Sequence, residues 1–307
     1  MRLLTDDRDA VRFEMTTDDG VVLVGERRGP HTAPAVVLLH GGGQTRFSWS
    51  GTADQIAGRD WQAVTLDARG HGESGWSPNG DYTPQRHAQD VATLLDELPA
   101  GPVLVGASLG GLTTLQLVGT MKRGVASGVV LVDIVPRFDP NGSKRIMAFM
   151  RAHCETGFQS VDDAAEAVAA YNHYRRRPST TSGLLNNLRE RGGRWYWHWD
   201  PAILGAGGDV PTADAIDQQA LDDAFATIID DGVPMLLVRG SHSDVVTDEA
   251  TSALANRFPT LETAVVGGAG HMVAGDRNDE FNAVIVDFIL RHAPSDSAKS
   301  TREATRQ

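Results

Sequence analysis

Short runs of apolar, mostly β-branched residues recur along the chain, and each run is about as long as a β-strand. Within a run the apolar character is continuous rather than alternating, which is typical of strands that are covered on both faces of their sheet. Most of the runs end in Gly, His or Asp. They span residues 21–24, 35–39, 62–66, 102–105, 128–132, 235–238 and 263–266.

Stretches with helical periodicity lie between these runs. Residues 86–98 place Ala88, Val91 and Leu95 on one face, and residues 112–121 and 281–290 repeat apolar positions in the same way. Strands that alternate with helices predict an α/β fold, in which a doubly wound, mostly parallel sheet has helices on both sides.

One long region breaks the alternation, because residues 136–229 contain no run that resembles a buried strand. The spacing predicts helices at 146–154, 161–175 and 182–191. Irregular insertions of this length usually form lids or binding elements, so we expect a helical cap. The expected domains are a core in two parts (1–135 and 230–293), the cap (136–229) and a disordered polar tail (294–307).

Composition and charge narrow the class of protein. The 307 residues include one cysteine, Cys154, which excludes a disulfide scaffold and favours a reducing, cytoplasmic compartment. The formal charge of −12 disfavours nucleic acid and anionic membranes as partners. The acidic N-terminus does not resemble a signal peptide, and no apolar run approaches the roughly 18 residues of a membrane span. Monomer and homodimer both remain open.

A serine lies at the most informative turn. Residues 106–111 read Gly-Ala-Ser-Leu-Gly-Gly, between a predicted strand and a predicted helix, so Ser108 is the central residue of a G-x-S-x-G pattern in the context that this pattern requires. Gly106 and Gly110 lack side chains where strand and helix pass close together. We therefore expect Ser108 to be a nucleophile.

A serine nucleophile needs a base, and the base needs an acid that orients it. His271 follows the last predicted strand in a glycine-flanked loop, and Asp244 follows the strand before it. The carboxyl ends of parallel strands line one edge of a sheet, so these residues should meet Ser108 there. Asp133, which ends the 128–132 run, is the alternative acid; we favour Asp244 and interpret Asp133 as a turn former.

The loop after the 35–39 run is rich in glycine and reads His-Gly-Gly-Gly. Backbone amides of such a loop, together with the amide of Leu109, can hold the oxyanion of a tetrahedral intermediate. We expect Gly42 to be the loop donor and Gly43 to be the second choice. The loop lacks the ending of a phosphate-binding P-loop, no G-x-G-x-x-G is present, and no spacing suits a metal, so we expect neither cofactor nor metal ion.

These motifs together resemble the α/β-hydrolase superfamily, in particular its capped bacterial branch of serine esterases and lactonases. The stretch Asp67 to Ser74 is similar to the structural D-x-R-G-H-G-x-S turn of that superfamily, and the 136–229 insertion lies where the superfamily carries its cap. The resemblance covers residues 20–135 and 230–292. It implies a Ser-Asp-His triad, and serine at position 108 disfavours the branches that use an aspartate nucleophile.

The cap contains half of the six tryptophans within residues 195–199. Clustered indoles either wall a pocket or pack a cap against its core, and an extended segment can do both. We expect Trp197, Trp199, Gly43 and Met272 to contact the substrate. Phe47, Trp49, Phe138 and Met147 are further candidates.

The predicted activity is hydrolysis of small to medium carboxylic esters, apolar or aromatic, through an acyl-enzyme. A C–C bond hydrolase, a lactonase or a perhydrolase on the same triad is the alternative among enzymes. A ligand-sensing module on the same fold is the alternative without catalysis. A small-molecule ester is the one expected partner, and the residues alone do not identify it.

Overall fold

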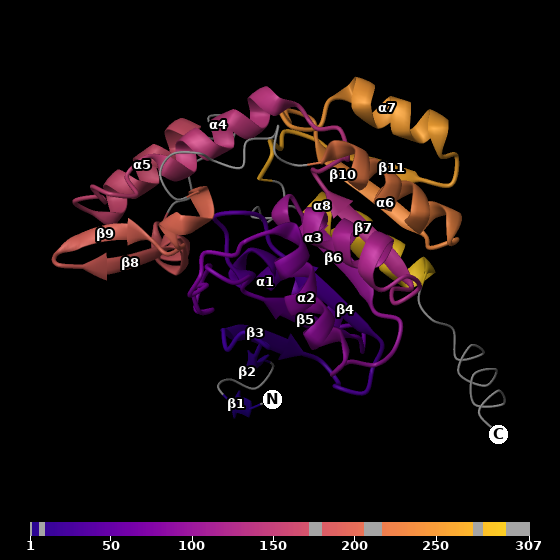
Figure 1. Cartoon of the computed structure of the whole chain (residues 1–307), viewed down its shortest axis with the longest axis horizontal. Coiled ribbons are helices and arrows are strands. Elements are labelled where there is room, and N and C mark those ends of the chain that lie inside the picture. The colour runs from indigo at the N-terminus through magenta and orange to yellow at the C-terminus, as the bar shows by residue number, and fades with distance from the viewer. Residues whose placement is uncertain (1, 6–9, 172–179, 206–216, 273–278, 293–307) are drawn as a thin grey trace.

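A nine-stranded sheet forms the centre of the molecule in the computed structural model, which describes residues 2–5, 10–171, 180–205, 217–272 and 279–292 (Figure 1). The strand order is β1-β2-β3-β5-β4-β6-β7-β10-β11. Neighbouring strands are parallel from β5 to β11, and β1, β2 and β3 form antiparallel pairs at the other edge. The bounds are β1 Arg2–Thr5, β2 Ala10–Thr16, β3 Val22–Arg28, β4 Ala35–Leu39, β5 Gln62–Leu66, β6 Val103–Ala107, β7 Gly128–Val132, β10 Met235–Gly240 and β11 Glu262–Val266.

The predicted α/β fold with a doubly wound, mostly parallel sheet is confirmed. All seven apolar runs overlap strands, and every residue of β4, β5, β6, β7 and β10 is buried, as continuous apolar character predicts. The edge strand β11 instead alternates, with Val265 49% exposed. Strands β1 and β2 were not predicted, because β2 interleaves Arg12 and Glu14 with its apolar residues.

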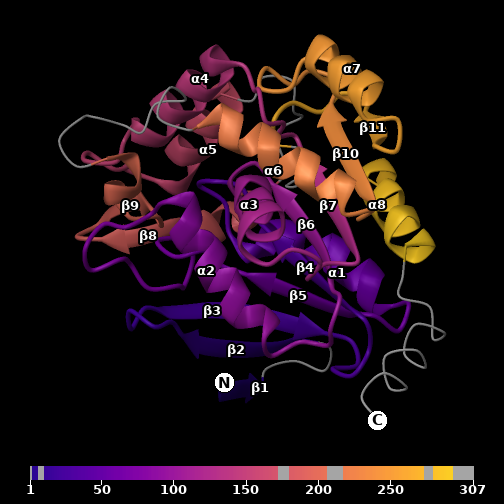
Figure 2. The same cartoon turned by 45° about the vertical axis from the view of Figure 1, so that its right-hand side comes forward.

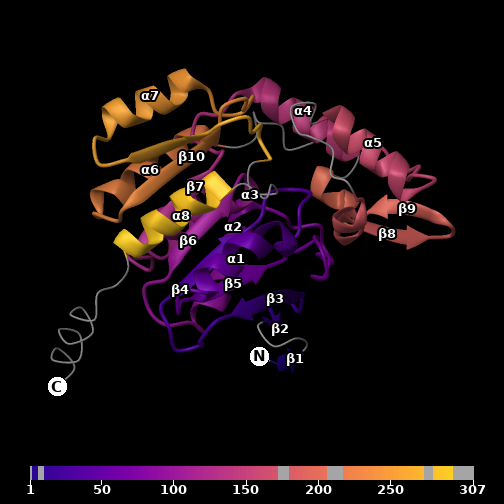
Figure 3. The ribbon, with the colours of Figure 1, turned by 180° about the vertical axis from the view of Figure 1, so that it is seen from behind.

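Helices cover both faces of the sheet. On one face α2 (Pro84–Leu95), α3 (Leu109–Gln116), α6 (Gln218–Asp230) and α7 (Asp248–Arg257) bury apolar side chains in a common cluster (Figure 2). On the other face α1 (Ser50–Ala57) and α8 (Asp279–Arg291) pack in a second cluster (Figure 3). The two clusters sandwich the sheet, so the strand ends that carry the site residues are rigidly held.

The insertion forms an arc beside one edge of the core and has a small apolar cluster of its own (Figure 1). It contains a hairpin that was not predicted, and the predicted helix at 182–191 is wrong in its second half, where β8 begins. The elements are α4 Pro140–Arg151, α5 Val161–Tyr171, the 3₁₀ turns Ser182–Asn187 and Pro201–Leu204, and the antiparallel strands β8 Leu188–Arg191 and β9 Arg194–Trp197.

Helix α6 lies within the range predicted for the cap, yet it packs on the core. Its residues Leu221, Phe225 and Ile228 belong to the same apolar cluster as α2 and α3. The predicted boundary at residue 229 therefore assigns one core helix to the cap. The predicted disordered tail, residues 294–307, lies outside the described residues. Within the described ranges no helix is both long and apolar enough to cross a membrane.

Candidate active site

Ser108 lies at the tip of a sharp turn between β6 and α3. Its backbone has φ 46° and ψ −109°, a region that L-residues rarely adopt and that projects the side chain out of the turn. A Cβ atom at Gly106 would lie 2.3 Å from the carbonyl oxygen of Gly110, and one at Gly110 would lie 2.4 Å from that of Leu39. Both positions therefore require glycine, as the sequence indicated.

His271, in the loop after β11, reaches this serine. Its Nε2 lies 3.1 Å from Ser108 Oγ, within hydrogen-bond distance. Its other ring nitrogen, Nδ1, lies 2.7 Å from Oδ2 of Asp133. A continuous hydrogen-bonded chain thus runs from hydroxyl to imidazole to carboxylate, and the three residues come from loops that follow β6, β11 and β7.

The prediction that Asp244 is the acid is wrong. The Asp244 carboxylate pairs with Arg145 of helix α4 and is about one-third exposed, so it faces the insertion rather than the imidazole. The carboxylate that hydrogen-bonds to Nδ1 of His271 is that of Asp133. Both aspartates follow the carboxyl ends of neighbouring core strands, and the pattern of residues along the chain does not tell which carboxylate turns toward the histidine.

Asp133 is held in place on several sides. The residue is fully buried and has a positive φ of 52°, which turns its side chain toward the end of β10. Its Oδ1 accepts the Gly240 amide at 3.0 Å, and its Oδ2 accepts the Ser243 hydroxyl at 2.5 Å. A buried carboxylate with three hydrogen-bond donors orients the imidazole in one tautomer.

Two backbone amides beside Ser108 are available to a substrate oxygen. The Gly43 amide donates to Nε2 of His71 at 3.1 Å, and the Gly41 amide donates to the side chain of Gln44 at 3.0 Å. Among the described residues, the Gly42 amide has no acceptor within the protein, and neither has the amide of Leu109 in the first turn of α3. Helix N-termini favour negative charge, so Leu109 is well placed to bind an oxyanion.

A cavity of about 1810 Å³ opens over these groups, between the core and the insertion. The predicted contact residues Gly43, Trp197, Trp199 and Met272 line it, as do Phe47, Phe138 and Met147. The expectation for Trp49 is wrong, because this fully buried residue stacks on Phe281 at 6.0 Å in the core beneath the site.

The tryptophan cluster combines the two interpretations that the sequence left open. Trp197 and Trp199 stack with ring centroids 4.9 Å apart, and both belong to the apolar cluster of the insertion. Trp197 also donates its indole N–H to the carbonyl of Ala152 at 3.1 Å. Both rings line the cavity as well, so they pack the insertion and present an aromatic wall at the same time.

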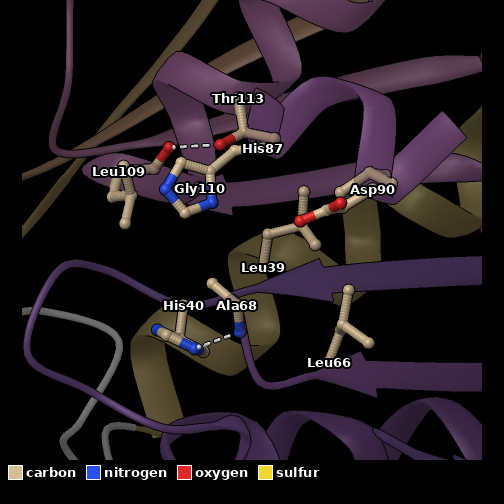
Figure 4. Close-up of a pocket in the computed structure, with 10 residues that line it drawn as sticks. Leu39, His40, Leu66, Ala68, His87, Asp90, Leu109, Gly110 and Thr113 are labelled. Carbon is tan, nitrogen blue, oxygen red and sulfur yellow. Dashed lines mark hydrogen bonds between the residues drawn. The ribbon is translucent and has the colours of Figure 1, made fainter. Parts of the chain in front are cut away.

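Several buried histidines surround the turn that carries Ser108. Burial lowers the pKa of His40 to about 4 and those of His71 and His87 to about 3, with a further lowering of the pKa of His71 by His40. His40 and His87 both line a small cavity behind the turn, and His40 Nε2 accepts the Ala68 amide there at 3.0 Å (Figure 4). These rings are neutral at neutral pH.

Within the described part of the chain, no group of three or more His, Cys, Asp or Glu side chains is arranged to hold a metal ion. The groups that converge on the cavity are therefore a hydroxyl, an imidazole, a buried carboxylate and two backbone amides. A serine–histidine–aspartate chain at the carboxyl ends of parallel strands defines a hydrolase-type site on an α/β sheet.

Comparison with known proteins gives the family. The chain belongs to the alpha/beta hydrolase family, whose model matches residues 36–284. It is 31% identical to the esterase Rv0045c of Mycobacterium tuberculosis, over 80% of this chain and 79% of that protein. It is 30% identical to the mouse sn-1-specific diacylglycerol lipase ABHD11, over 85% of this chain and 82% of the lipase.

Solved structures of similar proteins have the same fold. A crystal structure of an alpha/beta hydrolase from Novosphingobium aromaticivorans superposes with a TM-score of 0.77 and 25% identity, and the match covers 93% of this chain and all of the other. The family and the relatives make this protein a hydrolase related to esterases and lipases.

Proposed function

We propose that this protein hydrolyses carboxylic esters through an acyl-enzyme, with Ser108 as nucleophile, His271 as general base and Asp133 as the acid that orients it. The observation that carries the proposal is the unbroken hydrogen-bonded chain from Ser108 Oγ through His271 to Asp133 at the floor of a large cavity. The similarity to a mycobacterial esterase and a mammalian lipase supports an ester as the substrate.

In the first half-reaction Ser108 Oγ attacks the ester carbonyl carbon while its proton moves to Nε2 of His271. The carbonyl π electrons move onto oxygen, and the amides of Gly42 and Leu109 donate hydrogen bonds to the resulting oxyanion. The intermediate then collapses, the bond to the alkoxy oxygen breaks, and His271 returns the proton to the leaving alcohol. Asp133 stabilises the imidazolium that forms in between.

In the second half-reaction a water molecule takes the place of the alcohol. His271 accepts a proton from this water as its oxygen attacks the acyl carbon, and the same two amides hold the second oxyanion. Collapse breaks the bond to Ser108 Oγ, which recovers its proton from His271. The products are a carboxylic acid and an alcohol, and no redox step takes place.

The cavity wall suggests which esters would bind. Its lining contains the aromatic rings of Trp197, Trp199 and Phe138, together with the methionines Met147 and Met272. Apolar and aromatic walls bind apolar and aromatic groups, and flexible thioether side chains adapt to different shapes. We therefore propose aromatic or medium-length aliphatic esters as substrates, with Gly43 close to the reacting carbonyl.

A panel of p-nitrophenyl and aryl esters that vary in acyl and alcohol size tests the proposal. Wild-type protein should hydrolyse several of them, and Ser108→Ala should lower kcat by about 10⁴-fold or more. A fluorophosphonate should label wild type at Ser108 and leave Ser108→Ala unlabelled. Wild-type protein that neither turns over esters nor takes the label would refute the proposal.

The same panel separates the alternatives. A lactone, a vinylogous diketone and an ester with added peroxide distinguish a lactonase, a C–C bond hydrolase and a perhydrolase by their products. Saturable binding of an ester without turnover would identify a ligand-sensing module instead.

A further inference from the structure

Three buried imidazoles form a ladder between the insertion and the loop that follows β4. His40 and His71 have ring centroids 5.2 Å apart, and His71 and His198 have centroids 5.8 Å apart. Each ring is at most 2% exposed. His40 precedes the glycine loop, His71 belongs to the turn after β5, and His198 follows β9 of the insertion. The ladder thus joins three segments that lie far apart in the chain.

The backbone of Gly43 lies between two of these rings. Its amide donates to Nε2 of His71 at 3.1 Å, and its carbonyl oxygen lies 3.4 Å from Nε2 of His198. The Trp199 ring covers the same residue, since a Cβ atom at Gly43 would lie 3.3 Å from that ring. Gly43 is therefore held at its amide nitrogen by the core and at its carbonyl oxygen by the insertion, so the two peptide groups that flank its Cα are both anchored.

The remaining ring nitrogens determine the tautomers. Nδ1 of His71 faces the carbonyl of Arg69 at 3.1 Å, and Nδ1 of His198 accepts the Gly72 amide at 2.6 Å. Because an amide can only donate, His71 must be unprotonated at Nε2 and His198 unprotonated at Nδ1. Both rings must therefore be neutral for this set of contacts to exist.

We infer that His71 and His198 are positioning residues for the oxyanion-binding loop: they hold Gly43 by its amide and by its carbonyl, so that the neighbouring Gly42 amide, and not that of Gly43, faces the reacting carbonyl. This inference rests on the proposed function. The Gly43 amide already donates to His71, so it is not free to bind a substrate oxygen. The Gly42 amide is therefore the donor from the glycine loop.

Burial and the positively charged neighbours keep the three imidazoles of the ladder neutral. Burial is the main cause that lowers the pKa values of His71 and His198, and neighbouring histidines lower them further. Arg46 acts on His40 and Arg189 on His198 in the same direction, whereas Asp67 raises the pKa of His71 by a smaller amount. His71 thus stays a hydrogen-bond acceptor throughout the neutral and mildly acidic range.

The test compares His71→Gln with His71→Leu. Glutamine keeps an acceptor that can reach the Gly43 amide, whereas leucine fills similar space without one. We expect His71→Leu to lower kcat by about 10²-fold, the loss typical of one oxyanion donor, and to leave KM within about threefold. Affinity for a boronic-acid transition-state analogue should fall by the same factor as kcat. His71→Gln should recover at least tenfold of the loss in both measurements.

Ser74→Ala is the matched control for general damage to the turn. Ser74 donates to the carbonyl of Asp67 and accepts the Val24 amide, so its loss loosens the same turn without touching the glycine loop. It should lower the melting temperature and leave analogue affinity relative to substrate affinity unchanged. If His71→Leu does not fold, His198→Leu against His198→Gln makes the same comparison.

Equal losses in the leucine and glutamine variants, or a loss in KM alone, would overturn the inference. Failure of the proposed function is a separate outcome, because it would show as wild-type activity in Ser108→Ala and as wild-type protein without fluorophosphonate labelling.

Discussion

The imidazole of His271 hydrogen-bonds to the carboxylate of Asp133 at 2.7 Å. Asp133 directly follows β7, and Asp244 follows the neighbouring strand β10 but does not take this position. Strand β7 also lies beside β6, and Ser108 directly follows β6. The proposed acid and the proposed nucleophile therefore follow adjacent strands of the buried sheet, and the histidine bridges them from the loop after β11 at the edge.

This geometry predicts unequal effects for two aspartates. Asp133→Asn should lower kcat/KM by about 10⁴-fold, because an amide no longer selects the productive imidazole tautomer. Asp244→Asn, which breaks only the pair with Arg145, should stay within about threefold of wild type. Ester hydrolysis under identical conditions measures both. A larger loss of kcat/KM in Asp244→Asn than in Asp133→Asn would show that Asp244, and not Asp133, is the acid that orients His271.

The turn at Ser108 predicts a stability difference between two glycines. Gly106→Ala places a methyl group 2.3 Å from the carbonyl oxygen of Gly110, so the free energy of unfolding should fall by about 1–3 kcal/mol. Gly183→Ala meets nothing within 4 Å and should change it by less than about 0.5 kcal/mol. Urea denaturation gives both values. Equal stability of the two variants would contradict the crowding at the turn.

The buried histidines predict a stability that depends on pH. Their folded pKa values lie below the unfolded value of about 6.5, so the unfolded chain binds more protons as pH falls. The stabilisation is complete above about pH 6.5 and is lost progressively as pH falls, down to about pH 4 for His40 and about pH 3 for His71 and His87, at up to about 1.4 kcal/mol per pH unit for each ring.

Urea denaturation between pH 7.5 and 4.5 measures this slope. His87→Gln removes one of the rings and should make the slope shallower by up to about 1.4 kcal/mol per pH unit. Arg69 lowers the pKa of His87 and Asp81 raises it, with burial as the larger cause. A slope that is unchanged in His87→Gln would show that this ring does not contribute.

The aromatic wall predicts a change in selectivity. Trp197→Leu removes a stacked ring from the cavity and should lower kcat/KM for aryl esters by about 2- to 12-fold relative to an acetate ester, in line with the 0.5–1.5 kcal/mol of an aromatic pair. Stability should also fall, because the buried indole loses its bond to Ala152. Trp76→Leu is the control, because Trp76 is 43% exposed, and it should change neither the selectivity nor the stability. Unchanged selectivity would show that Trp197 packs the insertion and does not contact the substrate.

Much of the fold follows from local pattern. The strands at the sheet centre are buried on both faces, so their apolar runs are unbroken, and those runs mark β4 to β7 and β10 within a residue or two. The antiparallel edge and the 188–197 hairpin were missed because charged residues interrupt them: Arg12 and Glu14 in β2, and Arg189, Glu190 and Arg191 in β8.

The site was predictable where chemistry depends on backbone shape. Ser108 needs glycines on both sides, and that requirement is visible in the residues themselves. The choice between Asp133 and Asp244 depends on side-chain direction at two equivalent strand ends. The proposed choice of Gly42 over Gly43 depends on the hydrogen bond from the Gly43 amide to His71, which lies 28 positions further along the chain. Neither relationship leaves a periodic or compositional signal.

The contacts of His198 and Trp199 with Gly43 have a consequence for engineering this protein. The cap of an α/β-hydrolase is easily treated as an exchangeable module whose only role is to select what enters the pocket. Here a graft that replaces the segment around His198 would also remove a contact that holds the carbonyl of Gly43 in the glycine loop. Chimeras built at this junction should therefore carry residues 198–200 over with the core, or expect slower chemistry along with any new specificity.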